Sequence, residues 1–455
     1  MNPRASEPTH LFHQQVMSVP PVATGNLDEN LIRSERMLQV AYNALAFVEE
    51  HGYETYDISD AKGTPLVLWT YAHGGWFARL LRLALYGGLY IAPIRFRKLL
   101  RVRPSRYAHA SAMLACAYIE LYKITGERQY SERAGSLLEW LSQNTAQAPV
   151  GSCWGAPFPW FSYGGVVPVG VGSSHGTIWA ANAFLGQFET TRNQFALDQC
   201  VQACDFLAFG LNSTRHASGS LSVSYSVLDC SQCLNINADA ASVLLRLSKL
   251  ITKPAYYQSG VGMLQFVIEN QNRDGSWSYD VPLQGKASTN IDGRPWSPNI
   301  DGFHTGMVLS ALCWALPAVV DSDLHRSCKA GLEKGARFYM GNLFTADGKP
   351  RYSLKSFYPI DPYSCGQAMI SLLDICQCRV LDFDLRQRAA LLVAGVADFT
   401  IESMLEPDGS FLTARYRFRA IRLKSLRWAQ AVLSLAYVRY GGFLLTQLRA
   451  DGHPS

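Results

Sequence analysis

The sequence predicts an all-α fold, an (α/α)6 toroid with long glycine-, proline- and aromatic-rich loops at one face. Uncharged, mostly apolar helices alternate with amphipathic ones along the chain, and the former are typical of buried helices. We place the starts of the apolar helices at Ser105, Gly172, Asn235, Asp301, Tyr363 and Lys424. Successive starts lie 61 to 67 residues apart, which is the length of one helical hairpin and one long loop.

Ring closure explains how a chain of 455 residues can form a single domain. Six inner helices need six outer partners, and five of these follow their inner helices directly in the sequence. The sixth is the amphipathic helix from Leu31 to Glu50, which we expect to pack beside the last inner helix. We therefore predict one toroid over residues 27–446, with a flexible N-terminus (1–26) and a flexible tail (447–455).

The loops repeat as well as the helices. In the stretch from Asn270 to Leu309, an Asp-Gly turn is followed by Trp277 and Tyr279, a polar loop and an apolar inner helix. Glycine in such a turn supplies the backbone conformation that other residues avoid. We expect the mouth of a cavity where these loops enter the inner helices.

Composition describes a soluble globular protein. Hydrophobic residues make up 48% and charged residues 17% of the chain, and the net charge of +5 is too small to indicate a nucleic-acid partner. Eleven scattered cysteines suit a reducing cytoplasm, and the N-terminus shows no signal peptide. The apolar run from Leu83 to Ile94 is shorter than the roughly 20 residues of a membrane span. We expect a cytoplasmic protein, either free or peripheral to the inner membrane.

One segment is apolar and basic at once. Between Ala61 and Ile119 the chain has no acidic residue. Its bases are Lys62, Arg79, Arg82, Arg95, Arg97, Lys98, Arg101, Arg103 and Arg106. Either the arginines are solvated above a helical element packed on the body, or the segment contacts an anionic membrane face or an anionic glycan.

The residues that could carry chemistry cluster at the expected mouth. Asp301 and His304 begin an inner helix, and Tyr352 and Asp361 lie in the neighbouring loop. Together they would form an acid–base set, although Asp301 would equally serve as a helix cap and His304 as a hydrogen-bonded core residue. Arg415 belongs to a basic run that is either a solvated edge or an anion site.

Aromatic side chains are the second group of candidates. Sugar rings stack on such side chains, but aromatic residues fill cores equally often. The candidates for substrate stacking are Trp154, Trp160, Tyr225, Trp277 and Tyr279. Cys230 and Cys233 form one isolated pair without the further ligands that zinc requires, so we expect no metal and no cofactor.

Several motifs resemble one family, the VpsJ-like polysaccharide biosynthesis proteins of bacterial exopolysaccharide and capsule systems. The matching segments are YDISDAKG (56–63), CWGAPFPW (153–160), SYSVLD (224–229), NQNRDGSWSYD (270–280), NIDGFHTG (299–306), YPIDPYS (358–364) and LRWAQA (426–431). The resemblance implies a toroid of the six-hairpin glycosidase type. One departure is Pro159, which stands where such proteins tend to have an Asp, so no role for that acid is carried over.

A second, partial resemblance concerns GMLQFVIENQNRDGSW (262–277), which is similar to the QW motif of terpenoid cyclases. The acidic DxDD motif of those cyclases is absent. At 382–384 the chain has only DFD, in a segment expected to be an outer helix.

These observations lead to three hypotheses. The first is a carbohydrate-active enzyme that hydrolyses, eliminates or epimerises an anionic, uronic-acid glycan during polysaccharide assembly, free or lipid-linked. The second is a non-catalytic glycan-binding scaffold, and the third is a terpenoid cyclase or prenyltransferase-like toroid. The cavity lining discriminates between them: paired carboxyls favour hydrolysis, and a wholly aromatic and aliphatic lining favours an isoprenoid.

Overall fold

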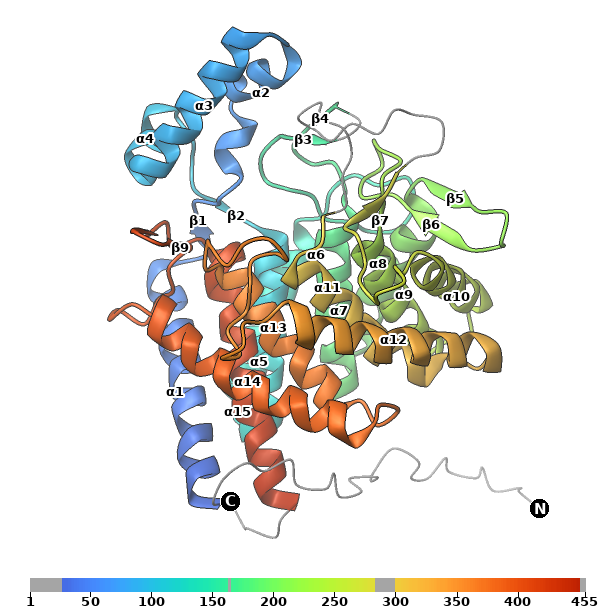
Figure 1. The fold of residues 1–455 in the computed structure, drawn as a ribbon. Coiled ribbons are helices and arrows are strands. Elements are labelled where there is room, and N and C mark those ends of the chain that lie inside the picture. The colour runs from blue at the N-terminus through green and yellow to red at the C-terminus, as the bar shows by residue number, and fades with distance from the viewer. Residues whose placement is uncertain (1–26, 163–164, 283–298, 451–455) are drawn as a thin grey trace, which may run out of the picture.

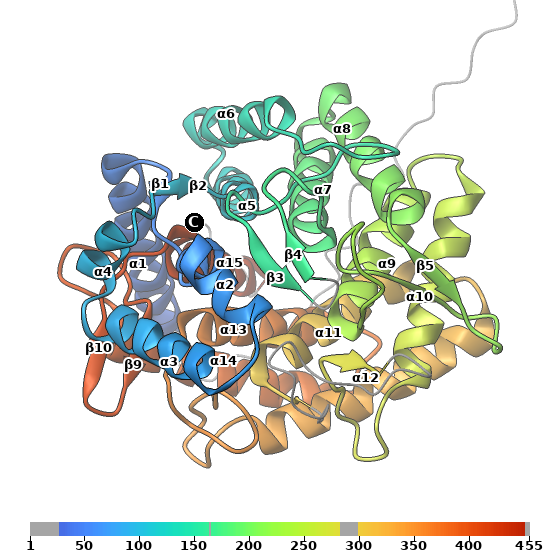
Figure 2. The same ribbon diagram turned by 90° about the horizontal axis from the view of Figure 1, so that it is seen from above.

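Helices arranged in two concentric rings make up the body of the molecule (Figures 1 and 2). The computed structural model describes residues 27–162, 165–282 and 299–450. Its inner helices are α5 (Ala108–Thr125), α7 (Ser174–Thr191), α9 (Leu234–Ser248), α11 (Gly302–Ala315), α13 (Pro362–Gln377) and α15 (Ala431–Ala450). Its outer helices are α1 (Leu27–His51), α6 (Arg128–Gln143), α8 (Gln194–Asp205), α10 (Pro254–Glu269), α12 (Ser322–Asn342) and α14 (Phe383–Met404). The predicted (α/α)6 toroid is confirmed.

The period in the sequence located the inner helices closely. Each begins within three residues of its predicted start, if the π-helical turn Leu426–Gln430 is counted as the beginning of α15. The last helix continues to Ala450, so residues 447–450, which we expected in the flexible tail, are helical. The predicted flexible segment 1–26 lies outside the described residues.

The ring closes between the two ends of the chain. Helix α5 packs against both α7 and α15, and α1 packs along α15 as its outer partner. The Ser34 hydroxyl donates a hydrogen bond of 2.9 Å to the carbonyl of Gly441, and Arg33 bonds the Tyr440 hydroxyl. The first and last helices therefore depend on each other.

Four turns of one kind connect outer helices to the loop face. Each spans five residues, and the amide of the first donates to the carbonyl of the fifth at 2.8–2.9 Å. The turns are 216–220, 272–276, 345–349 and 406–410, and the fourth residue of each is a glycine with positive φ. Glycine adopts this conformation without steric cost, which explains why it recurs there.

The loops at this face carry short antiparallel strand pairs. These are β1 (Glu54–Thr55) with β2 (Ser105–Arg106), β3 (Trp160–Ser162) with β4 (Gly165–Val167), β5 (Ser213–Arg215) with β6 (Leu221–Val223), β7 (Gln232–Cys233) with β8 (Asp280–Val281), and β9 (Ala414–Tyr416) with β10 (Arg419–Ile421). Three further helices stand above the same face: α2 (Pro65–Ala72), α3 (Trp76–Ile91) and α4 (Pro93–Leu99) (Figure 1). Among the described helices, none is both long and apolar enough to cross a bilayer.

Ring closure can be tested at Gly441. A Cβ added there would lie 2.7 Å from Leu38 Cγ on α1, whereas a Cβ at Gly135 on α6 would meet nothing within 4 Å. We expect Gly441→Ala to lower the free energy of unfolding by ~1–3 kcal/mol through overpacking. Gly135→Ala should instead raise it by up to ~1 kcal/mol, because alanine is the better helix former. Urea denaturation measures both, and equal effects of the two substitutions would contradict the packing of α1 on α15.

Candidate functional site

The second residue of every inner helix belongs to a layer at the loop end of the ring. These residues are His109, His175, Asn235, Phe303, Tyr363 and Arg427. Ring centroids of His109 and His175 lie 4.3 Å apart, and those of Phe303 and Tyr363 lie 5.4 Å apart. The ring centroids of His109 and Tyr363 lie 6.1 Å apart, which joins α5 to α13 past the intervening α15. We call this set the axial layer.

His304 and Asp301 form a dyad beside the axial layer. Asp301 is the N-cap of α11, and its Oδ1 accepts the backbone amide of His304 at 2.9 Å. Its Oδ2 lies 2.7 Å from His304 Nδ1. Because a carboxylate can only accept, Nδ1 carries the hydrogen and Nε2 keeps the lone pair for a ligand. The cap that we considered as an alternative is therefore present, and it also orients the imidazole.

Asp361 lies at the start of the neighbouring inner helix. It caps α13 by accepting the Ser364 amide at 2.7 Å, and its other oxygen accepts Trp428 Nε1 at 2.5 Å. Burial, together with the nearby charge of Asp301, raises the pKa of Asp361 to about 6 despite these hydrogen bonds. Such a carboxyl can hold a proton at a pH at which an exposed aspartate has lost it.

Tyr352 approaches both carboxylates. The adjacent residue, Ser353, forms an antiparallel bridge with Asp301, so the Tyr352 loop runs beside the start of α11. Burial and then the charges of Asp361 and Asp301 raise the pKa of Tyr352 to about 12. With 38% of its surface exposed, the neutral phenol can donate a hydrogen bond to a ligand. The structure thus brings all four predicted catalytic residues together.

The predicted aromatic candidates divide into two groups. Tyr279 lies 4.4 Å from the His304 ring, and Trp160 meets Tyr225 edge-on at 5.5 Å, with all three aromatic side chains partly exposed. Trp154 and Trp277, by contrast, belong to the core.

The burial of these two tryptophans contradicts their predicted role in substrate stacking. Trp154 is fully buried and donates Nε1 to the Leu141 carbonyl at 2.9 Å. Trp277 is 2% exposed and donates to the Val267 carbonyl at 3.0 Å. Each indole thus bonds an outer helix behind the loop instead of facing the mouth.

Arg415 does not point at the mouth either. Its backbone pairs with Ile360, next to Asp361, but its guanidinium donates to the carbonyl of Ser403. The cation that reaches the axial layer is Arg427. Its Nε and Nη2 donate to the two oxygens of buried Asp57 at 2.8 and 2.7 Å.

Burial and the charge of Arg427 both affect the two histidines of the layer. Burial lowers the pKa of His109, and the nearby charges of His175 and Arg427 add to this effect. Burial, Arg427 and His304 lower the pKa of His175 to about 3. These shifts favour the neutral form of both imidazoles near pH 7.

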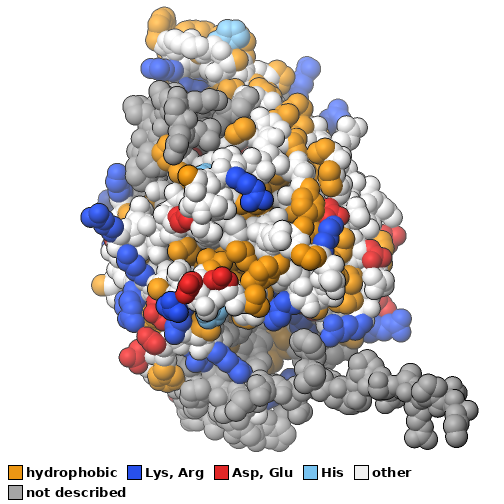
Figure 3. All heavy atoms as spheres, turned by 90° about the vertical axis from the view of Figure 1, so that its right-hand side faces the viewer, with side chains coloured by type: hydrophobic (Ala, Val, Ile, Leu, Met, Phe, Trp, Pro, Cys, Tyr) orange, Lys and Arg blue, Asp and Glu red, His pale blue; other side chains and the backbone are white. Residues whose placement is uncertain are grey.

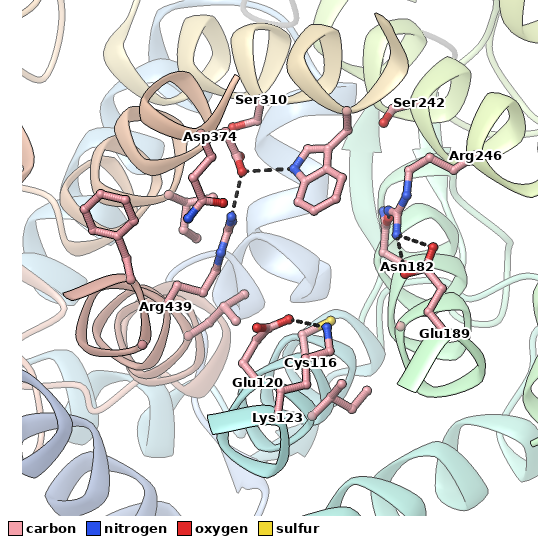
Figure 4. A pocket seen from close by; sticks show the side chains of 18 of the residues that line it. Cys116, Glu120, Lys123, Asn182, Glu189, Ser242, Arg246, Ser310, Asp374 and Arg439 are labelled. Atoms are coloured by element: carbon pink, nitrogen blue, oxygen red, sulfur yellow. Dashed lines mark hydrogen bonds and ion pairs between the residues drawn. The ribbon is translucent and has the colours of Figure 1, made fainter. Parts of the chain in front are cut away.

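A cavity of about 640 Å³ follows the axis from the axial layer toward the C-terminal ends of the inner helices (Figure 4). Trp179, Asp239 and Met307, each the sixth residue of its helix, line its upper part. Charged side chains line its lower part, among them Glu120, Lys123, Arg246, Asp374 and Arg439. This lining is not wholly aromatic and aliphatic, so it does not meet the condition set for an isoprenoid substrate.

Most charges in this cavity neutralise one another. Asp374 accepts hydrogen bonds from Arg439 at 2.6 Å and from Trp314 at 3.0 Å. Lys123 pairs with Glu120, and Arg246 pairs with Glu189. Burial and the charge of Asp374 raise the pKa of Asp239 well above its ordinary value, which favours its protonated form. The predicted catalytic residues lie at the loop end, beyond the axial layer from this cavity, and among the described residues no hydrogen bond is found at Nε2 of His304.

The axial layer also shows what the sequence reasoning missed. His109, His175, Arg427 and Asp57 all lie in motifs that we quoted or helices that we placed, yet none was a candidate. Aligning the six inner helices on their starts would have found the first three, because each is the second residue of its helix. Among the described residues, no group of three or more His, Cys, Asp or Glu side chains could hold a metal ion.

Comparison with known proteins bears on the fold. No protein-family model and no curated protein sequence matches the chain. One similar solved structure is an inactive variant of an α-1,6-mannanase from Salegentibacter sp. HEL1_6, in complex with α-1,6-mannotriose. The two sequences are 14% identical, and the superposition covers 76% of this chain and 92% of that chain with a TM-score of 0.56.

Two other solved structures are similar over a comparable length. A polysaccharide lyase is 12% identical, with 77% of this chain and 92% of that chain covered and a TM-score of 0.54. Cellobiose 2-epimerase from Bacillus thermoamylovorans B4167 is 12% identical, with 73% of this chain and 87% of that chain covered and a TM-score of 0.53. These likenesses show that the chain has the (α/α)6 toroid fold.

The environment of Asp361 predicts a pH effect on stability. Its pKa in the folded protein, about 6, lies above its ordinary value of 3.8. Its contribution to stability is therefore full below about pH 3.8 and is lost as the pH rises through 6, by on the order of 3 kcal/mol in total. Asparagine also caps helices but does not ionise. Asp361→Asn should thus gain stability relative to wild type between pH 4.5 and 7.5 in denaturant unfolding, and a constant difference would contradict a buried carboxyl with a raised pKa.

Proposed function

We propose that the protein binds a carbohydrate at the loop-face mouth and transfers protons to and from it. The observation that carries the proposal is the His304–Asp301 dyad beside the protonatable carboxyl of Asp361, at the N-terminal ends of two adjacent inner helices. A carboxyl that can hold a proton beside an imidazole that can accept one is an arrangement that general acid–base catalysis can use.

Each residue has a distinct role in this proposal. His304 Nε2 accepts a proton from the sugar in elimination or epimerisation, or from the attacking water in hydrolysis, and Asp301 holds the ring and stabilises the imidazolium that results. Asp361 delivers the proton on which hydrolysis, elimination and epimerisation all depend. Tyr352 donates a hydrogen bond to a sugar oxygen, since its raised pKa keeps the phenol protonated. Tyr279, Trp160 and Tyr225 provide apolar surface for a sugar ring.

Three features support a glycan as substrate. Partly exposed Tyr279 contacts the His304 ring, and Trp160 and Tyr225 form a second partly exposed aromatic pair among the loops. The inner helices direct their N-termini toward the mouth, and the positive end of a helix favours an anionic group such as a uronate. The similar mannanase, lyase and epimerase structures show that this fold accommodates hydrolysis, elimination and epimerisation of carbohydrates.

The biological setting is part of the same proposal. The resemblance to VpsJ-like proteins supports a role in exopolysaccharide or capsule biosynthesis, on a free or lipid-linked glycan. All eleven cysteines are unpaired in the structure, which suits a reducing cytoplasm. We propose a cytoplasmic protein at the inner membrane.

One alternative keeps a specific observation in its favour. Asp301 and Asp361 both cap inner helices, so each acid has a structural reason to be present even in a protein without activity. A non-catalytic glycan-binding scaffold would retain them for that reason alone.

Product analysis separates these possibilities. A panel of neutral and uronic-acid oligosaccharides, including α-1,6-mannotriose, is incubated with the protein and analysed by mass spectrometry and NMR. Hydrolysis consumes water, elimination leaves an ultraviolet-absorbing double bond, and epimerisation leaves the mass unchanged. Binding without any product would identify a scaffold.

We expect His304→Ala and Asp361→Asn each to lower kcat by about 10²–10⁴-fold, the usual contribution of a general acid or base. Trp277→Phe serves as the control, because this buried indole lies behind the mouth and should affect stability but leave kcat unchanged. Full activity of both mouth variants in folded protein would refute the proposed site.

A further inference from the structure

Helix α3 exposes an apolar stripe to solvent. Trp76, Leu80, Leu83 and Ile91 recur at the spacing of one helix face, and Trp76, Leu83 and Ile91 are 76%, 69% and 65% exposed. Phe77 beside the stripe and Leu99 on α4 are exposed as well. An amphipathic helix of a globular protein ordinarily turns such a stripe toward the core. Here it faces outward, on the part of the molecule that stands highest above the toroid (Figures 1 and 3).

The opposite side of these helices is firmly attached to the body, so the exposure does not reflect loose packing. Arg97 of α4 is buried and bonds Asp60 Oδ1 at 2.8 Å and the Asp57 carbonyl at 2.8 Å. Tyr71 of α2 stacks on Phe161 of β3 at 5.3 Å. Tyr90 of α3 meets Tyr416 of β9 edge-on at 5.0 Å. The body thus fixes which face of the helices is outward.

Exposed bases surround the apolar stripe. They are Arg79, Arg95, Lys98, Arg101 and Arg103. No acidic residue occurs between positions 61 and 119 to neutralise them. The buried Arg97 is a structural residue and does not belong to this set, although both alternatives for this segment count it among the exposed bases. The combination of exposed aromatic and aliphatic side chains with unopposed bases matches the interfacial region of an anionic bilayer.

We propose that the outward face of α2–α4 docks on an anionic lipid bilayer and thereby presents the mouth of the toroid to lipid-linked glycans. The second part rests on the proposed function. Helices α2–α4 and the loops that surround the mouth lie at the same end of the toroid (Figure 1). A protein that rests on these helices therefore turns its loop face, and not the C-terminal ends of its inner helices, toward the membrane.

A second copy of the chain fits this face less well. Two copies joined through the stripe would bring two sets of unopposed bases together, and like charges at an interface oppose association. Lipid phosphates, in contrast, complement the bases while the acyl region accepts Trp76 and Leu83.

Vesicle sedimentation tests the docking face. Full-length protein is mixed with vesicles of phosphatidylcholine and phosphatidylglycerol, or of phosphatidylcholine alone. We expect sedimentation with the anionic vesicles only, weakened by salt. The triple variant Arg79→Glu, Arg95→Glu, Lys98→Glu should bind at least about tenfold more weakly. Trp76→Ser with Leu80→Ser and Leu83→Ser should reduce binding similarly.

The matched control reverses three exposed arginines on outer helices: Arg128→Glu, Arg326→Glu and Arg337→Glu, whose side chains are 90%, 76% and 61% exposed. It changes the net charge equally and should keep vesicle binding. Equal loss in the control, wild-type protein that never sediments, or apolar-stripe variants that bind normally would each overturn the docking proposal. So would a wild-type dimer that ignores vesicles and becomes monomeric in the apolar-stripe variant.

Different variants test the docking proposal and the proposed function, so either can be refuted without the other. Apolar-stripe and basic variants should still turn over a water-soluble oligosaccharide while losing vesicle binding. His304→Ala should bind vesicles like wild type while losing turnover. If the apolar-stripe variant and the basic variant both lost turnover of the water-soluble oligosaccharide, α2–α4 would belong to the mouth itself. That result would overturn docking as their role.

Discussion

Closure of the inner ring is the constraint on which the rest of the structure depends. Because α1 packs on α15 and α5 packs on both α7 and α15, six inner helices must converge on one axis. The second residue of each then meets its counterparts at the loop end. This places the imidazoles of His109 and His175 in contact and brings Arg427 into the same layer. The Asp57–Arg427 pair ties the layer to the loop that precedes α2.

The two ends of the ring consequently differ in chemistry. At the loop end, helix N-termini, aromatic rings and the His304–Asp301 dyad surround Asp361. Toward the other end, paired charges such as Arg439–Asp374 and Lys123–Glu120 line the cavity. Pairing of this kind offsets part of the desolvation cost that each buried charge would otherwise carry. The proposed reaction uses groups at the loop end, and the proposed docking uses the helices above it.

The sequence predicted the architecture well because hydrophobic character and loop spacing repeat with one period. It also grouped Asp301, His304, Tyr352 and Asp361, because two adjacent inner helices begin at the two aspartates. It could not distinguish the partly exposed Trp160 from the buried Trp154 and Trp277. The sequence pattern of an uncharged loop does not reveal whether a tryptophan is exposed or donates its Nε1 to a carbonyl of an outer helix. Nor could it show that the Arg415 side chain points toward the carbonyl of Ser403, because that direction follows from the local pairing of β9 with β10.

Amide hydrogen–deuterium exchange, with and without the oligosaccharide that the product analysis selects, tests the central claim most directly. Occupancy of the mouth should slow exchange in the segments that contain Tyr225, Tyr279, His304 and Trp428. The segments that contain Glu120, Asp374 and Arg439 should exchange at unchanged rates. Slower exchange confined to the second group would place the glycan in the cavity below the axial layer and contradict the account.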